Sequence, residues 1–421
     1  MKSQNEFPKL SIAERDRRYQ AIRVKMDQAG LSGLLVWGNE SKWKTALANV
    51  RYITNRILPG LLFFPREGEP IVWSGFPHGV KSEKAGERWV NDIRPGGMTG
   101  DVIETLSSFG LAYERVGVIG FSNTRPQVVP DSVLYQPHSR ILSALPEVTF
   151  LDASGLLDDL RMIKSPEEIW MLEKSSALSD AMYEAMVRSF RPGVRECKVY
   201  ADMLQAAVAG GGEEDMIWLT TGPFPPAHAT KPPSSTRIAE AGDMLVTEYH
   251  SNYGGYISGI EHSISIGKPH EEFIKIHQVC LEAQKRGIDS MFPGVLLADV
   301  VMAFRKPIED AGMKFVECGV HGHGLGSPEF PSCMYGGSVG EWGWHPYAII
   351  PPIKLQENMV FGTASDIFNP VWKNDTGLML GDSVLITADG PRRLCSSPCL
   401  LYTSPSPRDH LLHLVCRLLL E

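Results

Sequence analysis

The segment Leu245–Gly267 constrains the fold of this chain more than any other stretch. It reads LVTEYHSNYGGYISGIEHSISIG, in which runs rich in β-branched and aromatic residues flank the pair Gly254 and Gly255. A glycine pair between two such runs is typical of a tight hairpin turn. The segment therefore predicts two antiparallel strands that pair closely along their whole length.

This hairpin also contains polar residues that could contribute to a functional site. Glu248 and His250 lie two residues apart on the first strand, so they share one face of the sheet. On the return strand Gly259 and Glu261 share a face in the same way. We expect this face to line a site, because carboxylates are seldom placed in a strand interior without a partner.

Short apolar runs separated by helical patterns predict an α/β domain over residues 1–155. Its first helix should begin after the cap Ser11 and end at Gly30. A second domain is expected over residues 160–395. It opens with a long helix for which Ser165 is the N-cap and Glu168 completes a capping box. A length of 421 residues agrees with two domains.

The pattern changes near the C-terminus. Residues 399–409 read CLLYTSPSPRD and resemble translated vector or adaptor sequence. We therefore expect residues 396–421 to be a non-native tail, to be set aside before the fold is considered.

Charge and cysteine content narrow the function classes. The formal net charge is −8 and basic residues form no stripe, which argues against nucleic acid or an anionic membrane as partner. No apolar run approaches the length of a membrane span. Seven cysteines are scattered without disulfide-framework or zinc-site spacing, so a cytoplasmic location is expected.

Further polar residues stand in loops and late strands. His321 and His323 alternate with glycines, which allow a ligand to approach the backbone closely. His228 ends the proline-rich loop TGPFPPAH, and Asp366 ends a strand-like stretch that begins near residue 357. Histidine and carboxylate side chains together suit proton transfer near neutral pH.

Taken together, these motifs resemble the M24 or pita-bread superfamily, which includes creatinase, ectoine hydrolase, prolidase and aminopeptidase P. The resemblance extends to about residue 395 and includes the linker RMIKSPEE that precedes the long helix. It implies an α+β fold, with a creatinase-type α/β domain followed by a pita-bread catalytic domain. Metallopeptidases of the family hold two divalent ions with five ligands.

Carried over position by position, the resemblance places the five ligand positions at Glu248, Gly259, His323, Ala364 and Gly381. Glycine and alanine cannot offset the charge of two cations. We therefore expect no dinuclear metal centre and no cofactor. The alternative is a single metal ion held by Glu248, His323 and Asp366.

Creatinase lacks these metal ligands and uses a histidine and a glutamate instead, and the resemblance matches them to His228 and Glu261. The resemblance thus implies a metal-independent hydrolase of a C–N bond in a small substrate. His228 would be the general acid and base, Glu261 its partner, and His323 a further catalytic pocket residue.

Substrate contacts are assigned to Glu248 and Asp366, and to Arg56 because related homodimers bring that region over the partner's site. Creatine itself is a poor candidate, since two of creatinase's substrate-binding positions hold Leu380 and Gly337. The aromatic stretch 341–345, EWGWH, is either a wall for a cationic substrate or a lid or interface loop.

Two other interpretations of the function remain. One is a metallohydrolase similar to Xaa-Pro dipeptidases or aminopeptidases, with an atypical ligand set. The other is a catalytically inactive protein of this fold that binds a ligand, because a fold alone does not fix a function.

Overall fold

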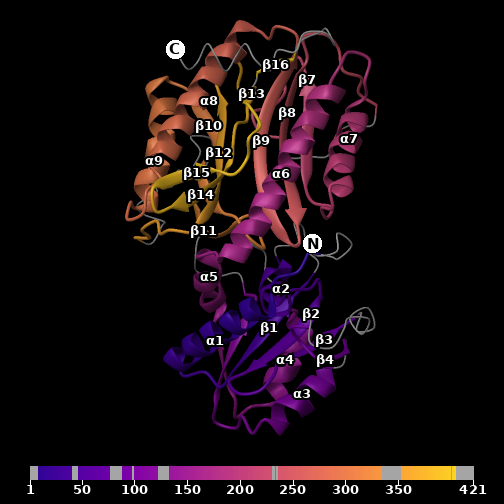
Figure 1. Ribbon diagram of the computed structural model, residues 1–421, viewed down its shortest axis with the longest axis vertical. Coiled ribbons are helices and arrows are strands. Elements are labelled where there is room, and N and C mark those ends of the chain that lie inside the picture. Colours follow the sequence, from indigo (N-terminus) through magenta and orange to yellow (C-terminus); the bar gives the residue numbers. More distant parts are fainter. Residues whose placement is uncertain are drawn as a thin grey trace. The chain divides into compact units, whose positions relative to one another are not determined.

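The computed structural model describes residues 8–39, 46–75, 88–96, 99–121, 132–229, 233, 236–333, 352–399 and 401–403. The chain forms two compact units, drawn in Figure 1. The first comprises residues 1–163 with 328–331, and the second comprises residues 164–327 with 332–421.

A mixed sheet is the centre of the first unit. Within its described residues the strand order is β4-β3-β2-β1-β5-β6, and β5 and β6 run parallel to β1. The strands are β1 (Gly33–Gly38), β2 (Gly60–Pro65), β3 (Ile71–Ser74), β4 (Asp92–Pro95), β5 (Arg115–Ile119) and β6 (Thr149–Asp152). The helices are α1 (Ile12–Ala29), α2 (Ala48–Thr54), α3 (Thr99–Ser108), α4 (Tyr135–Ala144) and α5 (Ser154–Met162).

The caps of α1 follow from the sequence. The hydroxyl of Ser11 accepts a hydrogen bond from the backbone N–H of Glu14. Gly30 ends the helix in the left-handed conformation, at φ 63°, which favours a residue without a side chain. Both predicted ends of this helix are confirmed.

Two sheets make up the framework of the second unit. One has the order β11-β10-β12-β14-β15, with β13 paired to β12, and the other has the order β16-β9-β8-β7. Their strands are β7 (Ile217–Gly222), β8 (Met244–Tyr253), β9 (Tyr256–Ile266), β10 (Lys314–Gly322), β11 (Glu329–Cys333), β12 (Val360–Phe368), β13 (Gly377–Leu378), β14 (Ser383–Thr387), β15 (Gly390–Arg393) and β16 (Tyr402–Thr403).

Helices cover these two sheets in pairs (Figure 1). α6 (Pro166–Ser189) and α7 (Glu196–Ala209) pack on β7–β9, whereas α8 (Glu271–Asp289) and α9 (Leu297–Asp310) pack on β10 and β12. A buried cluster that includes Met186, Phe190 and Leu245 fills the space between the first pair and its sheet. The predicted capping box at Ser165 is confirmed.

The predicted hairpin is β8 and β9, and its register decides which side chains meet. Gly254 and Gly255 form the turn with φ of 59° and 91°. Directly opposite each other lie Glu248 and Glu261, and likewise His250 and Gly259. All four side-chain positions therefore share one face of the sheet.

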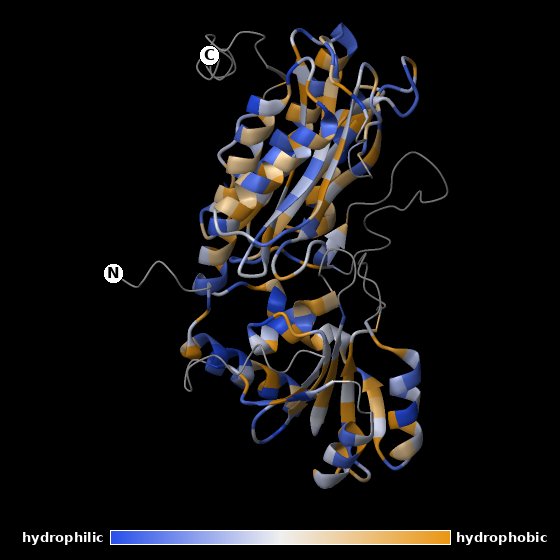
Figure 2. Cartoon of the chain, turned by 90° about the vertical axis from the view of Figure 1, so that its right-hand side faces the viewer, coloured by the Kyte–Doolittle hydropathy of each residue, from blue (hydrophilic) through white to orange (hydrophobic). Residues whose placement is uncertain are grey.

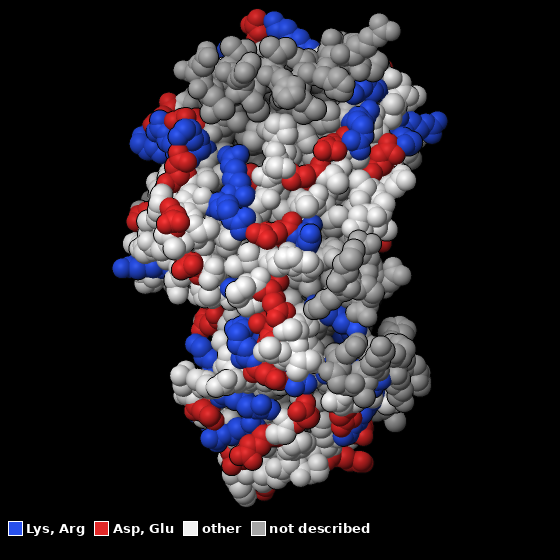
Figure 3. All heavy atoms as spheres, viewed as in Figure 1, with Lys and Arg blue, Asp and Glu red and all other residues white. Residues whose placement is uncertain are grey.

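Helix faces alternate between apolar and polar residues, as Figure 2 shows for the second unit. The face drawn in Figure 3 is mixed in charge, because Lys and Arg side chains are interspersed there with Asp and Glu. Pairs such as Lys285 with Asp289 and Lys306 with Asp310 lie on exposed helix faces. No helix among the described residues is long and apolar enough to cross a bilayer.

The expected α+β class is confirmed by this mixture of helices and sheets. Of the tail that begins at residue 396, residues 402 and 403 form β16, which pairs in parallel with β9. Residues 404–421 lie outside the described part of the chain. The foreign origin of the tail stays a prediction.

Candidate active site

The candidate site lies in the second unit, where the hairpin meets the opposite sheet. An isolated bridge joins Glu261 of β9 to Gly381, which lies two residues before β14. The inner face of β12 presents Ala364 and Asp366, and the loop after β7 brings His228 against it. The site is thus assembled from segments far apart in the chain.

His228 and Asp366 form the closest polar contact of the site. The imidazole Nδ1 lies 2.5 Å from Oδ2 of Asp366, and Nε2 lies 3.9 Å from Oε1 of Glu317. The side chain of His228 is 10% exposed, whereas that of Asp366 is fully buried. The loop histidine therefore has a fixed orientation and keeps an edge open to solvent.

A bulge in β10 places Glu317 in this contact. The register shifts between Phe315 and Cys318, so that Val316 and Glu317 together stand opposite Asp366 of β12. A bulge re-aims the side chain of the extra residue. Asp366 itself needs no bulge, because it lies two residues after Ala364 and shares its face.

Glu261 completes a compact acidic cluster with Asp366, Glu317 and Glu248. Burial and the neighbouring carboxylates, Asp366 foremost, raise the pKa of Glu261 well above its usual range. Burial and Glu317 raise the pKa of Asp366 in the same way. The carboxyl group of Asp366 acts on that of Glu261 and contributes to raising the pKa of Glu261. Oε2 of Glu261 and Oδ1 of Asp366 have no hydrogen-bond partner among the described residues.

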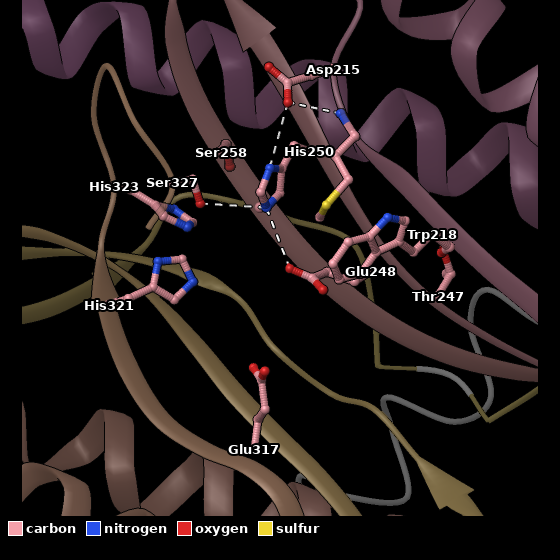
Figure 4. A network of polar contacts seen from close by, with 12 residues as sticks. Asp215, Trp218, Thr247, Glu248, His250, Ser258, Glu317, His321, His323 and Ser327 are labelled. Carbon is pink, nitrogen blue, oxygen red and sulfur yellow. Dashed lines mark hydrogen bonds and ion pairs between the residues drawn. The ribbon is translucent and has the colours of Figure 1, made fainter. Parts of the chain in front are cut away.

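His250 lies between two buried carboxylates next to this cluster (Figure 4). Its Nδ1 is 3.7 Å from Asp215, and its Nε2 is 3.5 Å from Glu248. Burial alone would lower the pKa of His250, but Asp215 and Glu248 raise it to about 9. Burial would raise the pKa of Asp215 and Glu248, but the interaction with His250 outweighs burial and lowers both pKa values. The group is a buried ion triad.

This triad predicts a dependence of stability on pH. An imidazole in the unfolded chain titrates near 6.5, and that of folded His250 at about 9. Its contribution, at most about 3 kcal/mol, is fully present below pH 6.5 and is lost as pH rises through 9. Urea unfolding between pH 6.5 and 9.5 measures it. A His250→Gln variant should lack this slope, and an equal slope in that variant would assign the loss to other groups.

His321 and His323 lie side by side next to the triad. Their ring centroids are 4.7 Å apart, and Nδ1 of His323 lies 3.0 Å from the hydroxyl of Ser383. Burial, then the neighbouring His321 and His250, hold the pKa of His323 well below its usual range. Its Nε2 has no hydrogen-bond partner among the described residues.

The residues present do not fit two metal ions at the five ligand positions named above. A Cβ at position 259 would lie 2.8 Å from His250, so the imidazole occupies the space of an aspartate there. A Cβ at position 381 would lie 2.1 Å from the backbone oxygen of Thr363 and 2.7 Å from Glu261. Position 364 holds alanine, whose side chain has no atom that could bind a metal ion. At positions 259 and 381 the space of the missing ligand side chains is taken by neighbouring atoms.

Another group of donors is better placed for a single ion. One ligand atom from each of His228, Glu317 and Asp366 lies within 4.8 Å of the others. No other group of three or more His, Cys, Asp or Glu among the described residues meets this condition. The alternative set of Glu248, His323 and Asp366 is therefore not brought within ligand distance.

Most of the residues predicted for the site do converge. His228, Glu261, Glu248 and Asp366 line one cluster, and His323 lies beside it. Arg56 belongs to the first unit, so its contact with substrate stays a prediction. Position 337 and the stretch 341–345 lie outside the described residues.

Glu317 and Asp215 belong to the site but were not predicted from the sequence. A signal existed for the first, because an acidic residue in an otherwise apolar strand, four residues before His321, shares its face in a regular strand. Asp215 carried no such signal, since it lies in the loop before β7.

Two family models match the chain. Metallopeptidase family M24 matches residues 171–388, and the creatinase/prolidase N-terminal domain matches residues 18–163. An uncharacterised peptidase of Bacillus subtilis is 23% identical over 90% of this chain and 98% of its own length. A Xaa-Pro dipeptidase of Pyrococcus furiosus is 29% identical over 58% of this chain and 66% of its own length. An ectoine hydrolase of Halomonas elongata is 26% identical over 62% and 65%.

Solved structures share the fold. A Xaa-Pro dipeptidase from Bacillus anthracis superposes with a TM-score of 0.73 at 22% identity, covering 92% of this chain and 99% of its own. The dipeptidase PepE from Mycobacterium ulcerans gives 0.73 at 24% identity, covering 94% and 100%. The expected creatinase-type first domain and pita-bread second domain are confirmed.

Proposed function

We propose that this chain, which belongs to metallopeptidase family M24, hydrolyses the amide bond of a small substrate of the Xaa-Pro dipeptide class. Family membership makes it a hydrolase. The substrate class is supported by its likeness to Xaa-Pro dipeptidases. The second candidate is a metal-independent hydrolase similar to creatinase, which was predicted because the family's metal ligands are missing. The likeness of the chain to an ectoine hydrolase supports this candidate.

One observation carries the proposal: His228, Asp366 and Glu261 converge from a loop and two strands into a linked, buried group. Nδ1 of His228 contacts Asp366, and Asp366 in turn contacts Glu261. Such a group can hold a proton and move it between positions without exposing a bare charge to the interior.

The reaction would use this group in two steps. A water molecule attacks the amide carbon, a C–O bond forms, and the water proton passes to the group. The C–N bond then breaks, and the same proton passes to the leaving nitrogen. Positioned general acids and bases of this kind typically contribute about 10²–10⁴-fold to the rate.

Charge supports an amine-bearing substrate. Glu248, Glu261, Glu317 and Asp366 act on one another electrostatically within the site. A site lined by acidic side chains attracts a positively charged group. The free α-ammonium group of a dipeptide carries such a positive charge.

The expected result of a substrate panel is turnover of Xaa-Pro dipeptides, followed by ninhydrin detection of released proline. Gly-Pro, Ala-Pro and Met-Pro are the test compounds, the reversed Pro-Gly and Pro-Ala are controls, and ectoine represents the second candidate. Assays run with and without added Mn²⁺ or Zn²⁺. Cleavage of ectoine alone would favour the second candidate, and no turnover at all would overturn both.

Homodimerisation and the contact from Arg56 stay predictions that come from the resemblance, and the cytoplasmic location stays a prediction that comes from the spacing of the cysteines.

A further inference from the structure

We propose that His228, Glu317 and Asp366 bind one divalent transition-metal cation per chain, displaced from the ligand positions of the family. This deepens the proposed function and rests on it for catalytic use, but not for binding. It departs from the expectation of a metal-free site, which was based on the neutral residues Gly259, Ala364 and Gly381, and it uses other ligands than the alternative set of Glu248, His323 and Asp366.

Geometry is the first support. The three residues come from the loop after β7, from the bulge of β10 and from β12, and one donor atom of each lies within 4.8 Å of the others. A cation between them would be bound by an imidazole nitrogen and two carboxylate oxygens. None of the three stands at a family ligand position, since Asp366 lies two residues beyond Ala364.

The burial of several carboxyl groups side by side is the second support. The side chain of Glu317 is 7% exposed and that of Asp366 is fully buried. Glu261, which is not one of the three ligands, is 5% exposed, and its Oε2 has no hydrogen-bond partner among the described residues. Carboxylates buried side by side repel one another unless protons or a cation lie between them.

The donor set indicates the class of ion. Imidazole with carboxylates suits Zn²⁺, Mn²⁺, Fe²⁺ and Co²⁺, whereas Ca²⁺ and Mg²⁺ prefer oxygen ligands alone. Three protein ligands leave coordination positions open, as in catalytic sites. When bound, such a cation supplies Lewis-acid polarisation of a carbonyl or water oxygen. His228 and Asp366 then serve as ligands, and Glu261 is left to take and return the proton.

Metal binding itself tests the proposal. The full chain is dialysed against EDTA and then titrated with Mn²⁺ or Zn²⁺ by calorimetry, with Mg²⁺ as comparator and elemental analysis of the loaded protein. We expect one Mn²⁺ or Zn²⁺ per chain, little binding of Mg²⁺, and a higher Tm with the ion bound.

Three variants locate the ion. Glu317→Gln should weaken binding by about 100-fold or more, without changing Tm of the metal-free protein by more than a few degrees. His323→Asn should retain the ion, because His323 belongs only to the family's ligand positions. Glu282→Gln, an exposed carboxylate on α8, should behave as the wild-type chain.

Several outcomes would overturn the site: no stoichiometric binding, two ions per chain, an unchanged affinity in Glu317→Gln, or loss of the ion in His323→Asn. Full hydrolytic activity of the metal-free chain would overturn the catalytic use of the ion and leave the proposed function standing. An ion bound as expected with no dipeptide cleaved would overturn the proposed function and leave the site standing.

Discussion

Glu261→Gln is expected to lower kcat/KM for an accepted substrate by about 10²–10⁴-fold, the range for loss of a positioned general acid or base. The amide has nearly the shape of the carboxylate but cannot take a proton from water. Glu261 is buried and contacts Asp366, with one oxygen free of any described partner. Steady-state kinetics on the dipeptide identified by the panel measures the effect, which should appear mainly in kcat.

Two controls separate chemistry from folding. Glu282→Gln makes the same chemical change on an exposed face of α8 and should leave kcat and KM unchanged. The Tm of Glu261→Gln should stay at or above that of the wild-type chain, since the change removes a carboxylate from an acidic cluster. A variant that folds and retains kcat/KM within about threefold, below the range expected for such a group, would exclude Glu261 from proton transfer.

His250→Ala is expected to lower the free energy of unfolding by about 3–5 kcal/mol, the usual cost of removing one partner from a buried ion group. The side chain is 4% exposed and separates Asp215 from Glu248. Without the imidazole, two buried carboxylates lose their shared cation. Urea denaturation at pH 6.5, where the imidazole is charged in the folded chain, measures the loss.

A double-variant cycle shows whether charge is the reason. Glu248→Gln in the His250→Ala background removes one of the two unpaired charges and should recover part of the lost stability. In the wild-type background the same change should destabilise, because it leaves His250 with one carboxylate. Additive effects of the two changes would mean that Glu248 and His250 are not coupled, and the destabilisation would then come from the cavity alone.

Local patterns were enough to predict the framework around the site. The glycine pair at 254–255 fixed the turn of the hairpin, and a tight turn sets the register of the strands that follow. The facing of Glu248 with Glu261 follows directly from that register. Helix ends at Ser11, Gly30 and Ser165 were predictable for the same reason, because capping depends on residues close in sequence.

The composition of the site was only partly predictable. The structure brings His228, Glu261 and Asp366 together, as their assignment to one site requires. Glu317 enters through a bulge in β10, and no local pattern in that strand indicates an extra residue. Asp215 lies just before β7 and pairs with His250 of the neighbouring strand β8, a contact that depends on how these two strands pair.

The sequence by itself determined which carboxylates are missing from the family positions and how the hairpin presents those that remain, since both depend on residue identity and strand period. Only the tertiary structure decided where the remaining charged side chains of the site lie. There the side chains of His250 and Glu261 occupy the space beside Gly259 and Gly381, and Glu317 meets Asp366 and His228. The physical reason is that the distance between donor atoms arises from the packing of two sheets and a loop, which no spacing along the chain encodes.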